Sequence, residues 1–301
     1  MYDIIIIGAG PAGLTAAIYA RRAEKKVLVL EAMAYGGQII NTPDIENFPT
    51  IGHISGYDFA TKLYHQAKNL GAEFIFEKVT AIQSENGLQI VSTVENQYRA
   101  KAVIIATGTK NRPLGLSNES ALIGKGISYC ATCDGQLYKG KVVAVQGGGN
   151  TAVEEALYLA DIAKTVYLIH RRNEFRADEA ALNQLKAKTN VQLLVNSNVT
   201  KLNADDKLTS IEVTDNDGKV STLEVAALFV AVGRVPAAEN FNAVINLDEF
   251  GYIISGEDCH TNIDGIFVAG DSRTKALHQI VTATADGAIA ATEAVKYING
   301  I

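Results

Sequence analysis

The sequence has few cysteines, no excess of basic residues and no long apolar run, and each absence excludes a class of protein. Three cysteines in 301 residues are too few for a disulfide framework, and their odd number favours a reducing compartment. The 27 basic and 33 acidic residues give a net charge of −6, which argues against binding to nucleic acid or to an anionic membrane. No apolar run reaches the roughly 18 to 20 residues of a membrane span. Because Met1-Tyr2-Asp3 also lacks the basic start of a secretory signal, we expect a soluble, cytoplasmic protein.

The length of the chain predicts more than one domain. At 301 residues it is about twice the common domain size, and hydrophobic residues make up 48% of it, so the core will be ample. The 26 glycines indicate many tight turns and close backbone approaches. We therefore expect two domains, or one domain interrupted by another.

The first thirty residues predict a β-α-β unit. Residues 4–8 form a short, β-branched apolar run of the kind buried on both faces of a parallel sheet. Residues 8–13 read Gly-Ala-Gly-Pro-Ala-Gly, residues 14–26 suit a helix, and residues 27–30 resume the strand pattern.

The same pattern recurs in the middle of the chain. A strand at 141–145, a glycine turn at 147–152, a helix at 153–164 and a strand at 166–169 follow one another. This repetition predicts an α/β fold with two Rossmann-like, three-layer ββα nucleotide-binding domains. Further strands are expected at 103–109, 225–232 and 265–271, and a closing helix at 276–297.

The first glycine turn has the residues of a dinucleotide site. Gly8 suits the tight turn, Gly10 lets the backbone approach a pyrophosphate, and Gly13 lets helix and strand pack closely. Glu31 follows at the end of the second strand, where its carboxylate can accept hydrogen bonds from both ribose hydroxyls. A nucleotide with a free adenosine 2′-hydroxyl is therefore expected here, rather than a plain strand-to-helix turn.

The second turn has the opposite charge preference. Gly147 and Gly149 hold the first two glycine positions, and Ala152 is a permitted replacement at the third. At the position of the acidic residue the chain has a basic group instead, consisting of His170, Arg171, Arg172 and Arg176. Guanidinium groups grip a 2′-phosphate, so this site predicts NADP(H), with a solvated basic helix start as the alternative. Two such sites in one chain suggest FAD together with NADPH.

Cys130-Ala131-Thr132-Cys133 predicts the electron acceptor. This spacing suits a redox disulfide, or half of a zinc site that would need two more ligands. Cys259 and His260 lack matching spacing, so no metal is expected and Cys259 is interpreted as a spare loop thiol. Asp134, which follows the pair directly, can carry the proton that thiol–disulfide exchange requires. The histidines form no hydrolase motif.

Over essentially its full length the chain resembles the low-molecular-weight, bacterial-type thioredoxin reductases, a class II group of pyridine nucleotide-disulfide oxidoreductases. Cys-Ala-Thr-Cys just upstream of the second glycine turn is the most specific of the motifs. In order, the motifs are Gly8–Gly13, Glu31, Gly36-Gly37-Gln38, Glu46-Asn47-Phe48-Pro49, Ala106-Thr107-Gly108, Cys130–Asp134, Gly147–Ala152, His170-Arg171-Arg172 with Arg176, and Ala269-Gly270-Asp271.

The resemblance implies an architecture and a reaction. An FAD domain made of residues 1–112 and 242–301 would hold an inserted NADPH domain, residues 113–241, in a homodimer. Cys133 would face the flavin, Cys130 would attack the disulfide of thioredoxin, and Asp134 would be the acid/base. The family alternates between two domain orientations, which would need flexible crossings near 110–116 and 236–241. Further flavin-side contacts implied are Gly37, Gln38, Asn47, Ala106, Gly108, Asp271, His278 and Gln279.

Two departures from the family pattern affect these expectations. Gln136 and Leu137 stand where the family often has two aromatic residues, which weakens the expected docking site for thioredoxin. His278 replaces the usual Arg before Gln279, which makes that contact a candidate for pH sensitivity.

The predicted function is therefore an NADPH-dependent, FAD-containing reductase of thioredoxin. The alternatives are a reductase of a glutaredoxin-like protein or small disulfide, a reductase that takes electrons from ferredoxin, and a nucleotide-binding sensor without turnover. The arginines after the second glycine turn argue against ferredoxin as the donor, and the complete set of donor, flavin and dithiol sites argues against the sensor.

Overall fold

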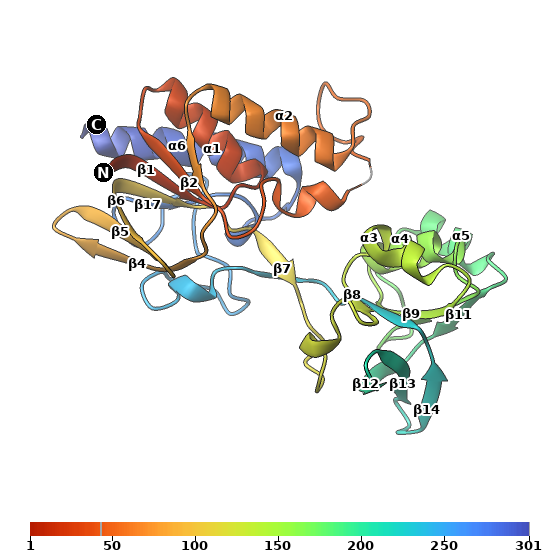
Figure 1. Cartoon of the computed structure of the whole chain (residues 1–301). Helices are drawn as coiled ribbons and strands as arrows, with labels where there is room; N and C mark the ends of the chain where they lie inside the picture. Colours follow the sequence, from red (N-terminus) through yellow and green to blue (C-terminus); the bar gives the residue numbers. More distant parts are fainter. Residues whose placement is uncertain (43, 301) are drawn as a thin grey trace. The chain divides into compact units, whose positions relative to one another are not determined.

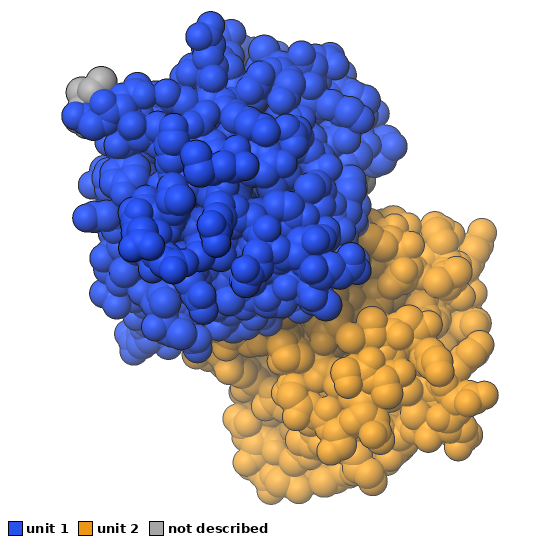
Figure 2. Space-filling view, turned by 60° about the vertical axis from the view of Figure 1, so that its left-hand side comes forward, with its two compact units in different colours: residues 1–110, 235–301 blue, residues 111–234 orange. Residues whose placement is uncertain are grey.

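The computed structural model describes residues 1–42 and 44–300, and it divides the chain into two compact units (Figure 1). Unit 1 contains residues 1–110 and 235–301, and unit 2 contains residues 111–234 (Figure 2). The expected boundaries are at 112/113 and 241/242. At the crossings, β7 (Thr109–Asn111) and β16 (Arg234–Pro236) pair with each other.

Unit 1 is built on a mixed sheet with the strand order β3-β2-β1-β6-β5-β4. β1, β2, β3 and β6 pair in parallel, and β17 pairs in parallel with the last residues of β6. β5 pairs antiparallel with both β6 and β4. The strands are β1 (Tyr2–Ile7), β2 (Val27–Leu30), β3 (Glu73–Ile75), β4 (Val79–Glu85), β5 (Leu88–Thr93), β6 (Gln97–Ile105) and β17 (Ile266–Val268).

The apolar run in β1 forms a central strand because both faces of the sheet are covered. Ile4 and Ile6 pack into a cluster with residues of the helices, whereas Ile5 and Ile7 pack into a second cluster with residues of β4 and β5. Figure 1 shows the three helices together on one side of this sheet. They are α1 (Pro11–Arg22), α2 (Gly56–Asn69) and α6 (Ile280–Asn299), and the short 3-10 helices are η1 (Gly37–Asn41), η4 (Glu239–Phe241) and η5 (Gly270–Ser272).

Unit 2 repeats this layout on a smaller scale, with a parallel sheet of order β11-β10-β9-β15-β8 and an antiparallel sheet of order β12-β13-β14. Val143 and Val145 of β9 pack with α4, and Ala144 packs with residues of β12 and β13. The strands are β8 (Ile127–Ser128), β9 (Val142–Gly147), β10 (Thr165–Ile169), β11 (Val191–Leu194), β12 (Ser197–Ala204), β13 (Leu208–Asp215), β14 (Val220–Glu224) and β15 (Ala227–Ala231). The helices are α3 (Ala131–Asp134), α4 (Asn150–Ala160), α5 (Glu179–Lys186), η2 (Ser120–Leu122) and η3 (Gly135–Tyr138).

The predicted α/β fold with two Rossmann-like elements is confirmed, but several expected bounds are wrong. The first helix begins at Pro11 rather than at residue 14, because proline is tolerated at a first helical position. The closing helix begins at Ile280, since Gln279 and Thr282 form a capping box. The strand expected at 103–109 ends at Ile105, and residues 106–108 leave the sheet.

No helix among residues 1–42 and 44–300 is long and apolar enough to cross a membrane.

Candidate functional site

In the first glycine turn, steric contacts require two of the glycines, and the third leaves open space beside the backbone. A Cβ added at Gly8, whose φ is +107°, would lie 2.4 Å from the carbonyl oxygen of Ala106. A Cβ at Gly13 would lie 1.9 Å from the carbonyl oxygen of Gly8. At Gly10 the nearest atom would be the Cα of Gly37, 4.0 Å away. Because Gly10 begins α1 without a side-chain cap, the first N–H groups of the helix face this open approach, which fits a pyrophosphate.

Glu31 lies against the same turn. Its Oε2 accepts the N–H of Ala9 at 2.8 Å, and its Oε1 accepts the N–H of Met33 at 3.0 Å. Each carboxylate oxygen keeps a further lone pair, so the group is held in place and can still accept ribose hydroxyls. Gly36 donates its N–H to the carbonyl of Ala9 at 2.7 Å, which brings the turn at Gly37 beside the first glycine turn.

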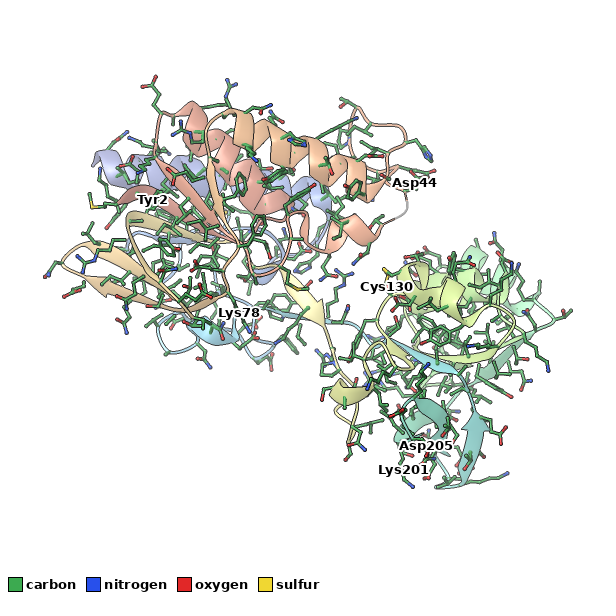
Figure 3. All side chains as sticks on the ribbon, in the orientation of Figure 1. Tyr2, Asp44, Lys78, Cys130, Lys201 and Asp205 are labelled. Carbon is green, nitrogen blue, oxygen red and sulfur yellow. A yellow bond between two sulfur atoms is a disulfide. The ribbon has the colours of Figure 1, made fainter. Side chains whose placement is uncertain are left out.

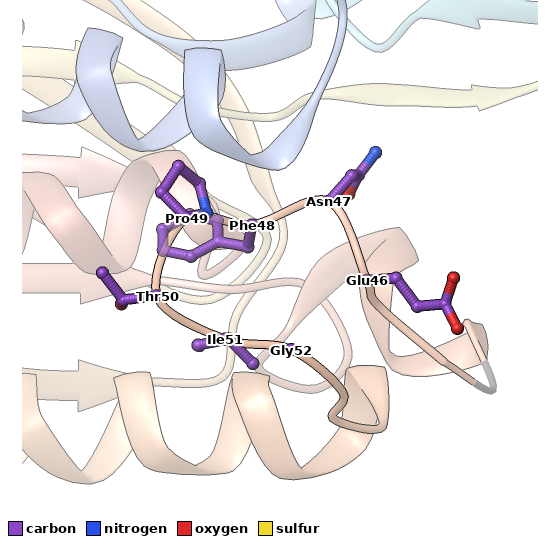
Figure 4. Close-up of a pocket in the computed structure, with 7 residues that line it drawn as sticks. All are labelled: Glu46, Asn47, Phe48, Pro49, Thr50, Ile51 and Gly52. Atoms are coloured by element: carbon purple, nitrogen blue, oxygen red, sulfur yellow. The ribbon is translucent and has the colours of Figure 1, made fainter.

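Two other predicted flavin contacts, 232 residues apart in sequence, touch each other. Asn47 Nδ2 donates to Gln279 Oε1 at 3.1 Å. Gln279 caps α6, and Asn47 belongs to the loop of residues 46–52 that lines a surface pocket (Figure 4). His278 is exposed, and its ring centroid lies 5.4 Å from that of Tyr252. Gln38 is exposed near this loop on η1.

The loop that carries Asn47 also brings together three metal-ligand types that the sequence analysis did not single out. Within the described chain, ligand atoms of Asp44, Glu46 and His53 lie within 4.8 Å of one another. His53 Nδ1 is 2.7 Å from Asp44 Oδ2, and the imidazole is largely exposed.

Two buried oxygens at the ends of neighbouring strands have no hydrogen bond to any described residue. Ala106 and Gly108 follow β6, and the Oγ1 of Thr107 between them has no hydrogen-bond partner among the described residues. The same holds for Oδ1 of Asp271, which follows β17. Such orphaned oxygens fit a ligand rich in hydroxyl and N–H groups.

Unit 1 therefore gathers its predicted residues at one edge of the sheet. Gly8, Glu31, Ala106 and Asp271 follow the carboxyl ends of β1, β2, β6 and β17, which are neighbours in the sheet. Open α/β sheets bind their ligands outside these ends. The residues present fit a dinucleotide such as FAD.

The second glycine turn is also shaped by steric contact. A Cβ at Gly147 would lie 2.3 Å from the carbonyl oxygen of Ala231, and Ala152 is fully buried beside it. A Cβ at Gly148 would lie 2.2 Å from the imidazole of His170. Gly149 begins α4 without a side-chain cap and has no atom within 4 Å of an added Cβ, so it corresponds to the open Gly10 of unit 1.

His170 packs under this turn as a buried ring. It is 8% exposed, lies against the ring of Phe175 and has its Nε2 3.0 Å from the carbonyl oxygen of Glu174. Burial, helped by the arginines that follow, lowers the pKa of the imidazole, so the ring is neutral at pH 7. Whether it also touches a cofactor stays a prediction.

The three arginines after β10 are exposed. Arg176 donates its backbone N–H to the carbonyl of Gly148 at 2.7 Å, which holds it beside the glycine turn. Within the described chain the guanidinium groups of Arg171, Arg172 and Arg176 form no ion pair. They are therefore available to a phosphate, and this edge of unit 2 fits NADPH.

Cys130 and Cys133 form a disulfide with Cα atoms 5.3 Å apart. Figure 3 labels Cys130 at the start of α3. Cys130 caps this helix, since its Sγ accepts the N–H of Cys133 at 3.2 Å. Cys133 is exposed and Cys130 is half-buried. Cys259, expected as a spare loop thiol, is fully buried, and burial raises its pKa to about 12.

Ser128 links Asp134 to the disulfide and was missed by the sequence analysis. Its Oγ donates to Asp134 Oδ2 at 2.6 Å and accepts the N–H of Cys130 at 3.1 Å. The carboxyl that follows the cysteine pair is therefore oriented by a hydroxyl that also touches that pair. A serine two residues before a cysteine carries no sequence signal by itself.

Glu155 of α4 is a second missed residue beside the cysteines. Its Oε1 accepts the N–H of Ala131 at 3.3 Å, and its Oε2 is buried without a partner among the described residues. Burial raises the pKa of this carboxyl from 4.5 to about 7. A signal existed in the sequence, because Ala152 and Leu159 lie one helical turn to either side and place Glu155 beside the buried face of α4.

Comparisons with known proteins agree with this geometry. A thioredoxin reductase of Listeria innocua is 41% identical over 300 residues, which cover 99% of this chain and 94% of that protein. The crystal structure of Lactococcus lactis thioredoxin reductase matches with a TM-score of 0.93 and 38% identity over 100% of both chains. A ferredoxin-flavin thioredoxin reductase of Clostridium acetobutylicum matches less well, with a TM-score of 0.56 and 31% identity over 99% of this chain and 98% of that chain.

The family profile described as pyridine nucleotide-disulphide oxidoreductase matches residues 2–287. Together with the two glycine turns and the dithiol pair, this match shows that the chain belongs to the pyridine nucleotide-disulphide oxidoreductase family.

Proposed function

We propose that the protein is an NADPH-dependent FAD flavoprotein that reduces the disulfide of thioredoxin through Cys130 and Cys133. The observation that carries the proposal is the disulfide beside Asp134, in the unit whose glycine turn is followed by three arginines that form no ion pair with the described residues. The name of the Listeria and Lactococcus relatives, which match over nearly the whole chain, supports thioredoxin as the substrate.

Unit 1 would hold FAD at the carboxyl ends of its parallel strands. Glu31 would accept the ribose hydroxyls, Gly10 would admit the pyrophosphate, and Asp271 would accept a hydroxyl of the polyol chain. A bound FAD would supply the redox chemistry that links hydride donation by NADPH to two-electron reduction of the disulfide. The residues proposed for this site are Gly8, Gly10, Gly13, Glu31, Gly37, Gln38, Asn47, Ala106, Gly108, Asp271, His278 and Gln279.

Unit 2 would hold NADPH at its own glycine turn. Gly149 at the start of α4 would admit the pyrophosphate, and the guanidinium groups would bind the 2′-phosphate, which NADH lacks. A neutral His170 supports the turn from below through Gly148. The residues proposed for this site are Gly147, Gly149, Ala152, His170, Arg171, Arg172 and Arg176.

The dithiol carries the electrons out of the protein. Two electrons and two protons convert the Cys130–Cys133 disulfide into two thiols. The thiolate of Cys130 then attacks one sulfur of the thioredoxin disulfide, and the thiolate that leaves takes up a proton. The thiolate of Cys133 attacks Cys130 in the mixed disulfide, which releases thioredoxin with a second thiol and restores the starting disulfide.

Asp134 would hold and deliver the protons of this exchange. Its Oδ2 accepts a hydrogen bond from the hydroxyl of Ser128, and the same hydroxyl accepts the backbone N–H of Cys130, so it links the carboxyl to the cysteine pair. We also propose that the protein is a cytoplasmic homodimer whose two units alternate in orientation, since one flavin face cannot meet both nicotinamide and disulfide at once.

Steady-state reduction of thioredoxin by the purified FAD-loaded protein tests the proposal. With NADPH and thioredoxin, Cys130→Ser should abolish thioredoxin reduction while NADPH still reduces the flavin. Cys259→Ala, which alters a buried thiol that takes no part in the proposed electron transfer, should keep most of the wild-type rate. If the wild-type protein reduces small disulfides but not thioredoxin, the partner is wrong, and if ferredoxin but not NADPH supplies electrons, the donor is wrong.

A further inference from the structure

Four charged side chains meet where β17 ends and α6 passes. The side chains of Arg273, Lys275 and Asp286 are 3%, 5% and 7% exposed, and that of Asp271 is 31% exposed. Two positive and two negative groups therefore lie close together, three of them almost without water. Buried charges of this kind are kept only where each has a partner.

Asp286 is the anchor of this cluster. Its Oδ1 accepts from Arg273 Nη1 at 3.0 Å, and its Oδ2 accepts from both Lys275 Nζ and the N–H of Gly270, each at 3.0 Å. Arg273 is fixed from its other side, since Nη2 donates to the carbonyl of Gly256 at 2.6 Å. With its partners in place, Asp286 holds the ammonium of Lys275 at one point.

The ammonium of Lys275 faces a buried carboxylate oxygen of the cluster that has no hydrogen bond to any described residue. Nζ lies 3.7 Å from Oδ1 of Asp271, which is within ion-pair distance but beyond hydrogen-bond distance. An ammonium has three donors, and Asp286 uses only one of them. Lys275 can therefore attract the Asp271 carboxylate without donating a hydrogen bond to it, so the carboxylate can accept a hydrogen bond from a ligand.

We propose that Lys275 is a positioning residue for the flavin site: anchored on Asp286, it holds the carboxylate of Asp271 in the orientation that accepts a hydroxyl of the FAD polyol chain. The inference rests on the proposed function, since it concerns the same FAD site. A carboxylate already held in the productive orientation loses less conformational entropy when the ligand binds, so affinity depends on the residue behind it.

Titration of the apoprotein with FAD and with ADP tests this role. Lys275→Met should weaken FAD binding about tenfold, as should Asp271→Asn, whereas ADP, which lacks the polyol chain, should bind within about twofold of wild type. The double variant should bind FAD about as well as Asp271→Asn alone, because Lys275 acts through Asp271. Lys296→Met, which removes an exposed lysine paired with Glu293, is the matched control and should change neither affinity.

The outcomes separate this inference from the proposed function. Unchanged FAD affinity in Lys275→Met, or losses that add in the double variant, would overturn the positioning role while leaving the flavoprotein intact. Equal losses of FAD and ADP affinity would show a merely structural lysine. If Lys275→Met does not fold, the double variant, which removes one charge of each sign, replaces it in the test. A double variant that binds FAD more weakly than Asp271→Asn alone contradicts the inference. A wild-type protein that binds no FAD would overturn both proposals.

Discussion

At the scale of single residues, Glu155 departs furthest from its ordinary chemistry among the carboxyl groups beside the cysteines. The N–H of Ala131 compensates one of its oxygens, and the other is buried without a partner in the described chain. Burial therefore raises its pKa from 4.5 to about 7. Between these two pH values the folded protein keeps a proton on Glu155 that the unfolded chain has released.

This linkage predicts how stability changes with pH. The cost of ionising Glu155 is absent below about pH 4.5, grows as pH rises and is complete above about pH 7, where it reaches roughly 3 kcal/mol. Glu155→Gln keeps an oxygen for Ala131 and removes the titration. The free energy of unfolding of the variant minus that of wild type should therefore be larger at pH 8 than at pH 5, as measured by urea unfolding.

Glu154→Gln provides the control for this prediction. Glu154 is the exposed neighbour of Glu155 on α4 and makes the smallest contribution to the raised pKa of Glu155, so its variant should keep most of the pH dependence of the wild type. A stability difference between Glu155→Gln and wild type that is the same at both pH values would refute the buried-charge account.

Residue by residue, the sequence predicts what local spacing determines. Glu31 could be placed because it ends a recognisable strand at a fixed distance from Gly8. Ser128, Glu155 and Lys275 could not be placed in the same way, because their significance depends on which distant groups the folded chain leaves buried and unpaired. Cys259 shows the same limit, since its loop was expected but its complete burial was not.

At the scale of elements, two neighbouring glycines of the second turn are required for different reasons. In the motif of the second turn, Gly148 occupies a position that allows any residue, yet an added Cβ would meet the ring of His170 at 2.2 Å. The motif predicts Gly149, where the nucleotide approaches, but it cannot predict Gly148, because the ring that requires it comes from the next strand end. Contacts between elements are the part of the turn that the sequence does not reveal.

Alanine at these two neighbouring positions should separate folding from binding. Gly148→Ala forces the buried His170 to shift and should destabilise unit 2 by about 1–3 kcal/mol. Gly149→Ala has open space and should cost under about 1 kcal/mol, but its methyl group should weaken NADPH binding. Thermal unfolding and NADPH titration of both variants check this, and strong binding by Gly149→Ala would mean that the pyrophosphate lies elsewhere.

At the scale of the whole molecule, one architecture is used twice with opposite charge. In unit 1 the strand after the glycine turn is followed by the carboxylate of Glu31, and in unit 2 it is followed by three guanidinium groups without an ion pair in the described part of the chain. The repetition made the fold class predictable from the sequence. Which disulfide partner docks is not predictable in this way, because the exposed Gln136 and Leu137 stand where the family often has two aromatic residues.

In the proposed reaction, electrons pass from NADPH through FAD to the Cys130–Cys133 disulfide. This transfer can be followed in an anaerobic titration of the FAD-loaded protein, by the yellow flavin absorption and by counting free thiols. We expect NADPH to bleach the flavin, NADH to do so far less effectively, and two new thiols to appear in the wild type but not in Cys130→Ser. A flavin that stays oxidised with NADPH, or a reduced flavin without new thiols, would rule out this path of electrons.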